Sequence, residues 1–125
     1  CAPAADQANN FIVTVPRVTD ALPAAVAIGN GAECGTPPAR EALIAALTEF
    51  AKVVETHTGT PLMLLISPAA EQQFDLARAF ARPLWATRNY CAPQYLSRPW
   101  QMWRANDAVR IEGAERPVGW DVVAP

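Results

Sequence analysis

Apolar residues recur at helical spacing between residues 38 and 57, and this is the strongest periodic signal in the chain. Leu43, Leu47, Phe50 and Val54 fall on one side of a helix with about 3.6 residues per turn. A single apolar stripe of this kind predicts an α-helix with one face packed against a core.

The residues around this segment carry signals for both helix ends. We expect Thr36 to cap the start and Pro37 and Pro38 to occupy the first turn, where the N–H group that proline lacks has no partner in any case. Gly59 suits the position just past the end, because glycine readily adopts the left-handed conformation that closes many helices.

The segment from residue 61 to residue 67, with the sequence PLMLLIS, is apolar at nearly every position. A continuous apolar run of this length predicts a strand buried on both faces, as in a parallel sheet. Ser67 and Pro68 then begin a further helix over residues 69–81. A helix is also expected over residues 4–14, and strands over residues 24–28, 84–87, 100–105 and 118–123.

Helices and strands alternate in the first part of the chain, and short strands follow with little helix between them. Alternation of this kind implies right-handed crossovers and a parallel sheet. We therefore expect the α/β class, with residues 1–125 forming a single domain.

The composition supports a folded domain and argues against two kinds of partner. Hydrophobic residues make up 51% of the chain, which is enough to form a core. The net charge is −2 and the arginines are scattered, so the clustered positive charge of a nucleic-acid binder is missing. The longest apolar run is too short for a transmembrane helix, which needs about 20 residues.

Three cysteines and a single histidine, His57, make a metal site hard to assemble, and no metal or cofactor is expected. Cys34 and Cys91 each follow a predicted strand and lie among small or turn-forming residues. We predict a disulfide between them. Two buried thiols are the alternative for a protein of the reducing cytosol.

Cys1 is followed by Ala2 and Pro3, and this beginning resembles a mature bacterial lipoprotein, in which the first cysteine carries the lipid. The other interpretation is a chain boundary that falls at a cysteine. The scarcity of lysine and the predicted disulfide favour export. We therefore expect a periplasmic protein or a lipoprotein anchored to the membrane through Cys1.

Several short segments follow one another in an order and at intervals that are typical of one enzyme family. They are Leu22-Pro23, Val54 to Gly59, Ser67-Pro68, Arg82 to Trp85, Trp100 to Trp103, Val109 to Gly113, and Pro117-Val118. In these segments the chain resembles the C-terminal part of glycoside hydrolase family 25, the lysozyme family of irregular β/α barrels that cleave peptidoglycan. The resemblance begins near residue 10 and covers nearly the whole chain.

The resemblance implies a partial β/α barrel, because the first three strands of the family's barrel have no counterpart here. A complete eight-stranded barrel takes about 200 residues or more. This chain offers about five strands, mostly parallel, with two to three helices. Such a half barrel has two open edges and an apolar inner face, so we expect a homodimer or a partner chain that covers the sheet. The alternative is a flattened sheet that packs as an ordinary open α/β layer.

The family's catalytic acids are missing from the matching positions. In the family, the strand after the Leu-Pro segment ends in Asp-x-Glu, and carboxylates two residues apart on a strand face the same sugar. The matching residues here are Ala27 and Gly29, and Gly119 replaces a further acid on the last strand. The resemblance therefore implies a non-catalytic relative that binds peptidoglycan or another glycan, or has a structural role, in the cell envelope.

Two other functions remain open. Asp121 lies two residues beyond Gly119 on the same side of its strand, and Glu33 lies in the loop after Gly29. These two carboxylates are candidates for a displaced acid pair in an active peptidoglycan-cleaving glycosidase. The other possibility is a half-barrel subunit whose missing strands and acids come from a partner.

Residues near the carboxyl ends of the strands are candidates for glycan contacts, because ligands bind at that end of β/α barrels. An inward arginine in an aromatic strand needs an acidic partner, so Arg104 is expected to form an ion pair with Asp121. Ordinary packing or a surface position is the alternative for each of the others. The candidates are Asn30, Trp85, Arg88, Tyr90, Trp103, Arg104 and Asp121.

Overall fold

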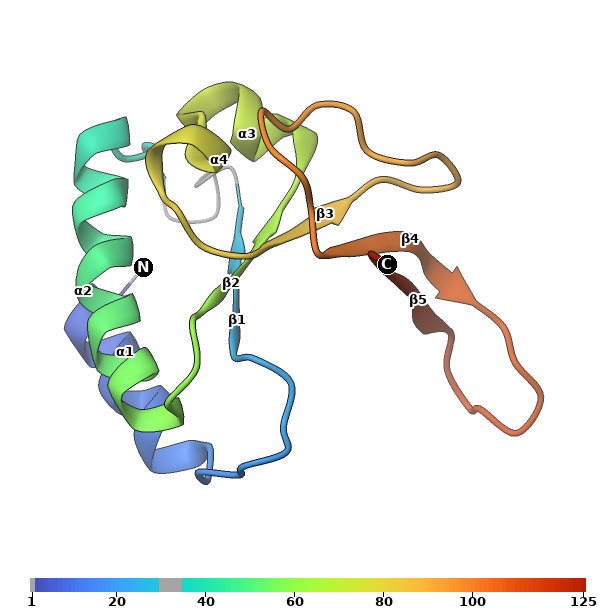
Figure 1. Ribbon diagram of the computed structural model, residues 1–125, viewed down its shortest axis with the longest axis horizontal. Coiled ribbons are helices and arrows are strands. Elements are labelled where there is room, and N and C mark those ends of the chain that lie inside the picture. The colour runs from blue at the N-terminus through green and yellow to red at the C-terminus, as the bar shows by residue number, and fades with distance from the viewer. Residues whose placement is uncertain (1, 30–34) are drawn as a thin grey trace.

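The computed structural model describes residues 2–29 and 35–125 (Figure 1). Its helices are α1 (Ala4–Thr14), α2 (Arg40–Thr58), α3 (Pro68–Phe74) and α4 (Leu76–Ala79). Its strands are β1 (Ala25–Ile28), β2 (Met63–Ile66), β3 (Leu84–Thr87), β4 (Met102–Val109) and β5 (Val118–Val123). The helix over residues 4–14 and the strands over residues 84–87 and 118–123 have the predicted bounds. The other elements differ by a few residues, and the predicted helix over residues 69–81 is divided.

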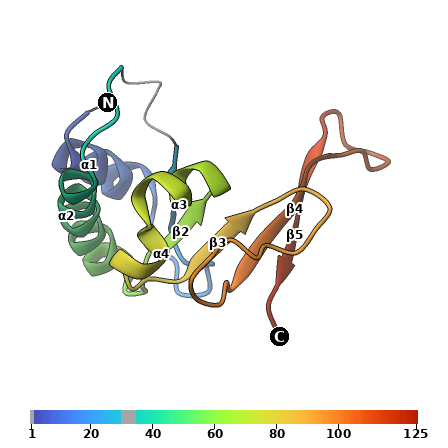
Figure 2. The same ribbon diagram turned by 90° about the horizontal axis from the view of Figure 1, so that it is seen from above.

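The strands form one sheet in the order β1-β2-β3-β4-β5. Strands β1 to β4 are parallel, and β5 is antiparallel to β4. The β4–β5 hairpin projects away from the rest of the chain (Figures 1 and 2). The expected open, mostly parallel sheet of a partial β/α barrel is therefore confirmed, with four described helices in place of the expected two to three.

The hydrophobic core lies between the sheet and the helices on one of its faces. Figure 2 shows α1 and α2 together on one side of β1 and β2. Alternate strand residues point toward these helices, as the period of a strand requires. The buried members of this core include Ile28, Leu64, Ile66 and Leu84 from the strands and Leu47, Ala51 and Val54 from α2.

The opposite face of the sheet, which would be the inside of a complete barrel, is partly open. Ala27 in β1 is exposed, Val123 in β5 is 69% exposed, and Leu65 in β2 is half-buried. Met63, at the start of β2, is buried. We call this surface the inner face.

The two ends of α2 differ in how well the sequence predicts them. Gly59 closes the helix with a φ of 76°, and its N–H donates to the carbonyl of Glu55 at 2.8 Å, as expected. The start was predicted wrongly. The helix begins at Arg40, after Ala39, and no side chain caps it, so Thr36 is not the cap. Pro38 keeps the preceding proline out of helical conformation, so both prolines lie before the first turn.

The predicted helix over residues 69–81 is broken at Asp75, which has a φ of 47°. The Nε of Arg40 in α2 donates to the carbonyl of Phe74 at 2.7 Å, and the N–H of Ala77 donates to the buried Glu71 carboxylate at 3.0 Å. In a continuous helix, both backbone groups would instead form hydrogen bonds within the helix. The start is as predicted, because the N–H of Ala70 donates to the Ser67 side chain at 3.2 Å.

The predicted disulfide finds no support in the part of the chain that the structure describes. Cys91 is exposed and its thiol is free. Its expected partner, Cys34, lies outside the described residues, as does Cys1, the candidate lipid attachment site. Among residues 2–29 and 35–125, none of the helices is both long enough and apolar enough to cross a bilayer.

Candidate functional site

The three positions without acids lie where the resemblance places them along the strands. Ala27 is the third residue of β1, Gly29 follows that strand, and Gly119 is the second residue of β5. The carboxyl ends of parallel strands share one edge of a sheet, and β5 starts at that edge because it runs in the opposite direction. None of the three has a side chain that can donate or accept a proton.

A polar cluster of Trp85, Arg104 and Asp121 occupies the inner face near this edge. The Nε of Arg104 donates to Oδ1 of Asp121 at 2.8 Å, so the predicted ion pair is confirmed. The same Oδ1 accepts a hydrogen bond from the indole nitrogen of Trp85 at 2.9 Å. The guanidinium carbon of Arg104 lies 4.8 Å from the centre of the Trp85 ring, at cation–π distance. We call these three residues the Arg104 cluster.

The Arg104 cluster neutralises its own charge. The side chains of Arg104 and Asp121 are 25% and 24% exposed, so their ion pair is largely shielded from water. Asp107 lies 3.8 Å from Nη1 of the same arginine, but its side chain is 62% exposed. An arginine between two carboxylates is a poor site for an anionic ligand, since both acids repel the anion.

Trp103 lies on the other face of the sheet. Its neighbour in the strand, Arg104, faces inward, and successive strand residues point to opposite faces. Its pairing partner in β3 is Ala86, which is fully buried on the helix-covered side. The Trp103 indole donates to the carbonyl of Arg88 at 2.7 Å, and its ring centre is 6.1 Å from that of Trp100.

Arg88 and Tyr90 follow β3, at the edge where we expected them. Their backbone N–H groups donate to the carbonyls of Arg104 at 3.1 Å and Ala105 at 2.8 Å, which continues the pairing between β3 and β4. The Tyr90 side chain is 79% exposed. The two remaining candidates, Asn30 and Glu33, lie outside the described residues.

Tyr95 is a residue at this edge that the sequence did not single out. Its hydroxyl donates to the carbonyl of Ile66, at the end of β2, at 2.7 Å and accepts from the N–H of Thr87, at the end of β3, at 3.0 Å. Burial raises the pKa of Tyr95. The residue lies in an irregular segment without periodicity, so no pattern could have identified it.

We predict that Tyr95→Phe lowers the free energy of unfolding by about 1–2 kcal/mol, because it removes the shared partner of two backbone groups. Urea denaturation followed by circular dichroism measures the change. Tyr90→Phe, which alters an exposed side chain, is the control and should have the stability of the wild type. A Tyr95→Phe midpoint equal to that of the wild type would contradict the role of the hydroxyl.

A second ion pair lies outside the inner face and joins α2 to the segment before β3. The Nε and Nη2 of Arg82 donate to the two carboxylate oxygens of Glu55 at 2.6 and 3.0 Å, and the N–H of Leu62 donates to Oε1 at 2.8 Å. These hydrogen bonds satisfy the carboxylate with a fork of two parallel contacts. The arrangement positions the start of β2, and it is structural.

This pair makes stability depend on pH. The Arg82 guanidinium hydrogen-bonded to Glu55 holds the pKa of that carboxyl below its ordinary value of 4.5. The carboxylate therefore stabilises the fold above the pKa of the unfolded chain, and this contribution is lost as pH falls through the folded pKa. We expect Glu55→Gln to lose about 1–2 kcal/mol at pH 7. The difference from the wild type should shrink at acidic pH, as thermal melts from pH 7 to 3 will show; a constant difference would contradict the assignment.

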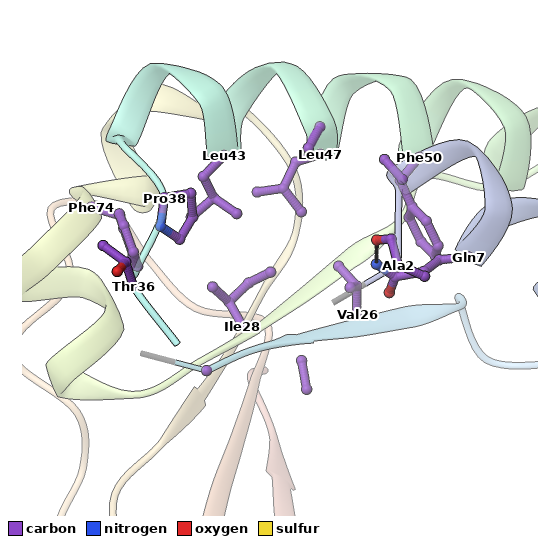
Figure 3. A pocket seen from close by; sticks show the side chains of 14 residues that line it. Ala2, Gln7, Val26, Ile28, Thr36, Pro38, Leu43, Leu47, Phe50 and Phe74 are labelled. Atoms are coloured by element: carbon purple, nitrogen blue, oxygen red, sulfur yellow. Dashed lines mark hydrogen bonds between the residues drawn. The ribbon is translucent and has the colours of Figure 1, made fainter. Parts of the chain in front are cut away.

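An apolar pocket of about 470 Å³ lies on the helix-covered side of β1, away from the Arg104 cluster. Figure 3 shows apolar side chains from β1 and α2 pointing into it. The lining is almost wholly apolar and contains no carboxylate, so the pocket offers no groups for acid–base chemistry. Its main members are Val26, Ile28, Leu43, Leu47, Phe50 and Phe74. In the described parts of the chain, no three acidic, histidine or cysteine side chains are grouped closely enough to hold a metal ion.

Solved structures with the same fold are lysozymes and related hydrolases. A family 25 glycosyl hydrolase from Bacillus anthracis superimposes with a TM-score of 0.85 at 23% identity, and a bacterial lysozyme from Streptomyces coelicolor with 0.77 at 14%. The spore cortex lytic enzyme SleM from Clostridium perfringens gives 0.73 at 20%. The matches cover 99%, 99% and 97% of this chain and 59%, 62% and 44% of those chains, respectively. No family model and no curated protein matches the sequence.

The resemblance seen in the sequence is therefore confirmed at the level of the fold. This chain spans about three-fifths of the length of the first two structures. The matched part corresponds to the open five-stranded sheet and its helices. The chain has the fold of part of a family 25 glycoside hydrolase.

Proposed function

We propose that the chain is a catalytically inactive, lysozyme-like module that binds a glycan in the cell envelope. The proposal is supported by the sequence resemblance, which matches the family's acids to Ala27, Gly29 and Gly119. Cleavage of a glycoside needs one carboxyl group that donates a proton and a second that attacks or orients. None of the three positions supplies either group.

The Arg104 cluster supports the loss of catalysis. Asp121 is the replacement acid that the structure places on the inner face, but its Oδ1 already accepts hydrogen bonds from Trp85 and Arg104. A proton on that oxygen would compete with both bonds and leave the arginine charge without its main partner. The geometry therefore favours a structural role for Asp121 over that of a general acid.

The choice of a glycan as ligand follows from the solved structures with the same fold, which are a glycosyl hydrolase and lysozymes. Peptidoglycan is the first candidate, and the exposed edge near Arg88 and Tyr90 is the surface that we assign to it. On the same ground we propose that the protein is located outside the cytoplasm, in the periplasm or at the cell envelope.

A sedimentation assay with insoluble peptidoglycan tests the binding. We expect saturable binding by the wild type that is weakened by Arg88→Ala. Arg116→Ala, which removes the same charge from the exposed hairpin tip, is the matched control and should bind like the wild type. Absence of the wild-type protein from the pellet at every concentration would contradict the glycan-binding proposal.

The partly open inner face supports a second proposal, that another polypeptide completes the sheet. The exposed Ala27 and Val123 favour this interpretation. A homodimer is the simplest form. Light scattering of the purified chain would give twice the monomer mass for a homodimer, and a monomer mass would contradict the homodimer.

A further inference from the structure

We infer that Arg104 acts as a plug at the edge of the sheet where the parallel strands have their carboxyl ends. By this we mean that its guanidinium occupies the space that a side chain at position 119 would need. A side chain at position 119 is then tolerated without loss of stability only when Arg104 is shifted or replaced. This inference holds whether or not the chain binds a glycan.

The space around Gly119 carries the first step. A Cβ atom placed on this glycine would lie 3.0 Å from Cζ, 3.1 Å from Nε and 3.1 Å from Nη1 of Arg104. Carbon atoms make their best contacts at about 3.5–4.0 Å, so the guanidinium must shift by a few tenths of an ångström to admit a side chain here. The three nearest atoms all belong to Arg104.

The backbone gives no other reason for glycine at this position. The described glycines with positive φ are Gly35, Gly59 and Gly113, and Gly119 is not among them. It lies inside β5, where glycine is unfavourable because it loses more conformational freedom than other residues. The contact with Arg104 is therefore the feature that excludes a side chain.

The contacts of the guanidinium oppose the shift that a side chain at position 119 needs. Its Nε is hydrogen-bonded to Asp121 at 2.8 Å, and its carbon atom lies over the Trp85 ring, 4.8 Å from the ring centre. Asp121 is fixed in turn by the Trp85 indole at 2.9 Å. A carboxylate introduced at 119 would lie against a positive charge that is held in place. The Arg104 side chain also covers one face of Trp85, so a ligand could not stack on that face.

A four-protein comparison tests the plug: wild type, Gly119→Ala, Arg104→Ala and the double variant. We expect Gly119→Ala alone to lower the thermal midpoint by roughly 5 °C, because the methyl group displaces the guanidinium. In the Arg104→Ala background the same change should leave the midpoint unchanged or raise it, since alanine is better than glycine inside a strand. An equal fall in both backgrounds would overturn the inference, because the backbone and not Arg104 would then exclude the side chain.

A second measurement applies even if Arg104→Ala fails to fold. The indole N–H resonance of Trp85, assigned by its loss in Trp85→Phe, reports on the hydrogen bond to Asp121. We expect Gly119→Ala to shift this resonance. Arg104→Thr serves as the alternative background in the stability comparison. An unshifted resonance in Gly119→Ala would show that the methyl group fits beside the arginine, and would overturn the plug.

Discussion

Leu64→Ala is expected to lower the free energy of unfolding by about 2–5 kcal/mol. Leu64 is fully buried in β2 among the residues that face the helices. The truncation removes the free energy gained by burying the leucine side chain, and it leaves a cavity. Because β2 is paired with a strand on each side, it cannot move to close this cavity. Urea denaturation monitored by tryptophan fluorescence measures the loss, which amounts to a large fraction of the stability of a small domain.

Leu65 provides the matched control in the same strand. It has the same side chain but faces the partly open inner face and is half-buried. We expect Leu65→Ala to cost clearly less than Leu64→Ala, because less apolar area is removed from contact. Equal losses would contradict a partly open inner face, and would mean that another polypeptide covers this face in solution as completely as the helices cover the other one.

Arg98→Met is expected to cost about 2–4 kcal/mol. The Arg98 guanidinium donates to the carbonyls of Ala77 at 2.6 Å and Phe80 at 3.0 Å, and also to that of Arg82. Methionine preserves much of the apolar stem but leaves these carbonyls at the end of α4 without their donor. Burial lowers the pKa of Arg98, although the group stays charged at any ordinary pH.

Arg78→Met is the control for this loss of charge. The Arg78 side chain is 75% exposed, and its contact with Asp75 is a surface ion pair of 3.7 Å. Such pairs contribute about 0–1 kcal/mol. Thermal denaturation of the two variants should therefore separate them clearly, and similar midpoints would show that the carbonyl contacts of Arg98 add nothing to stability.

Local patterns predicted most of the fold because they are set by residues close together in sequence. The apolar stripe around Leu47 and the left-handed Gly59 locate α2 and its end. The strand over residues 84–87 is bounded by Pro83 and the polar residues after Thr87, and its range is as predicted. Turn and cap signals of this kind act within a few residues.

The features that were missed depend on contacts between distant segments. At the break in the helix at Asp75, the side chain of Arg40 in α2 donates a hydrogen bond to the carbonyl of Phe74. Tyr95 reaches the ends of two strands from an irregular loop. Neither contact leaves a periodic signal in the sequence, and both require the tertiary structure to be known.

The candidate site was predictable in part. The Arg104–Asp121 pair followed from the cost of an inward arginine without an acid, and the structure contains it. The face occupied by Trp103 did not follow, because a shift of one residue in register moves every side chain to the other face. Glycan contacts by Trp85, Arg88 and Tyr90 stay predictions.

The most direct test of the central claim is release of reducing ends from peptidoglycan by the purified chain. The claim is that the strand-edge positions lack the acids for glycoside cleavage, so we predict no release above the background without protein. Release by the wild type that disappears in Asp121→Asn would contradict it, because Asp121 would then act as a catalytic acid despite its bonds to Arg104 and Trp85.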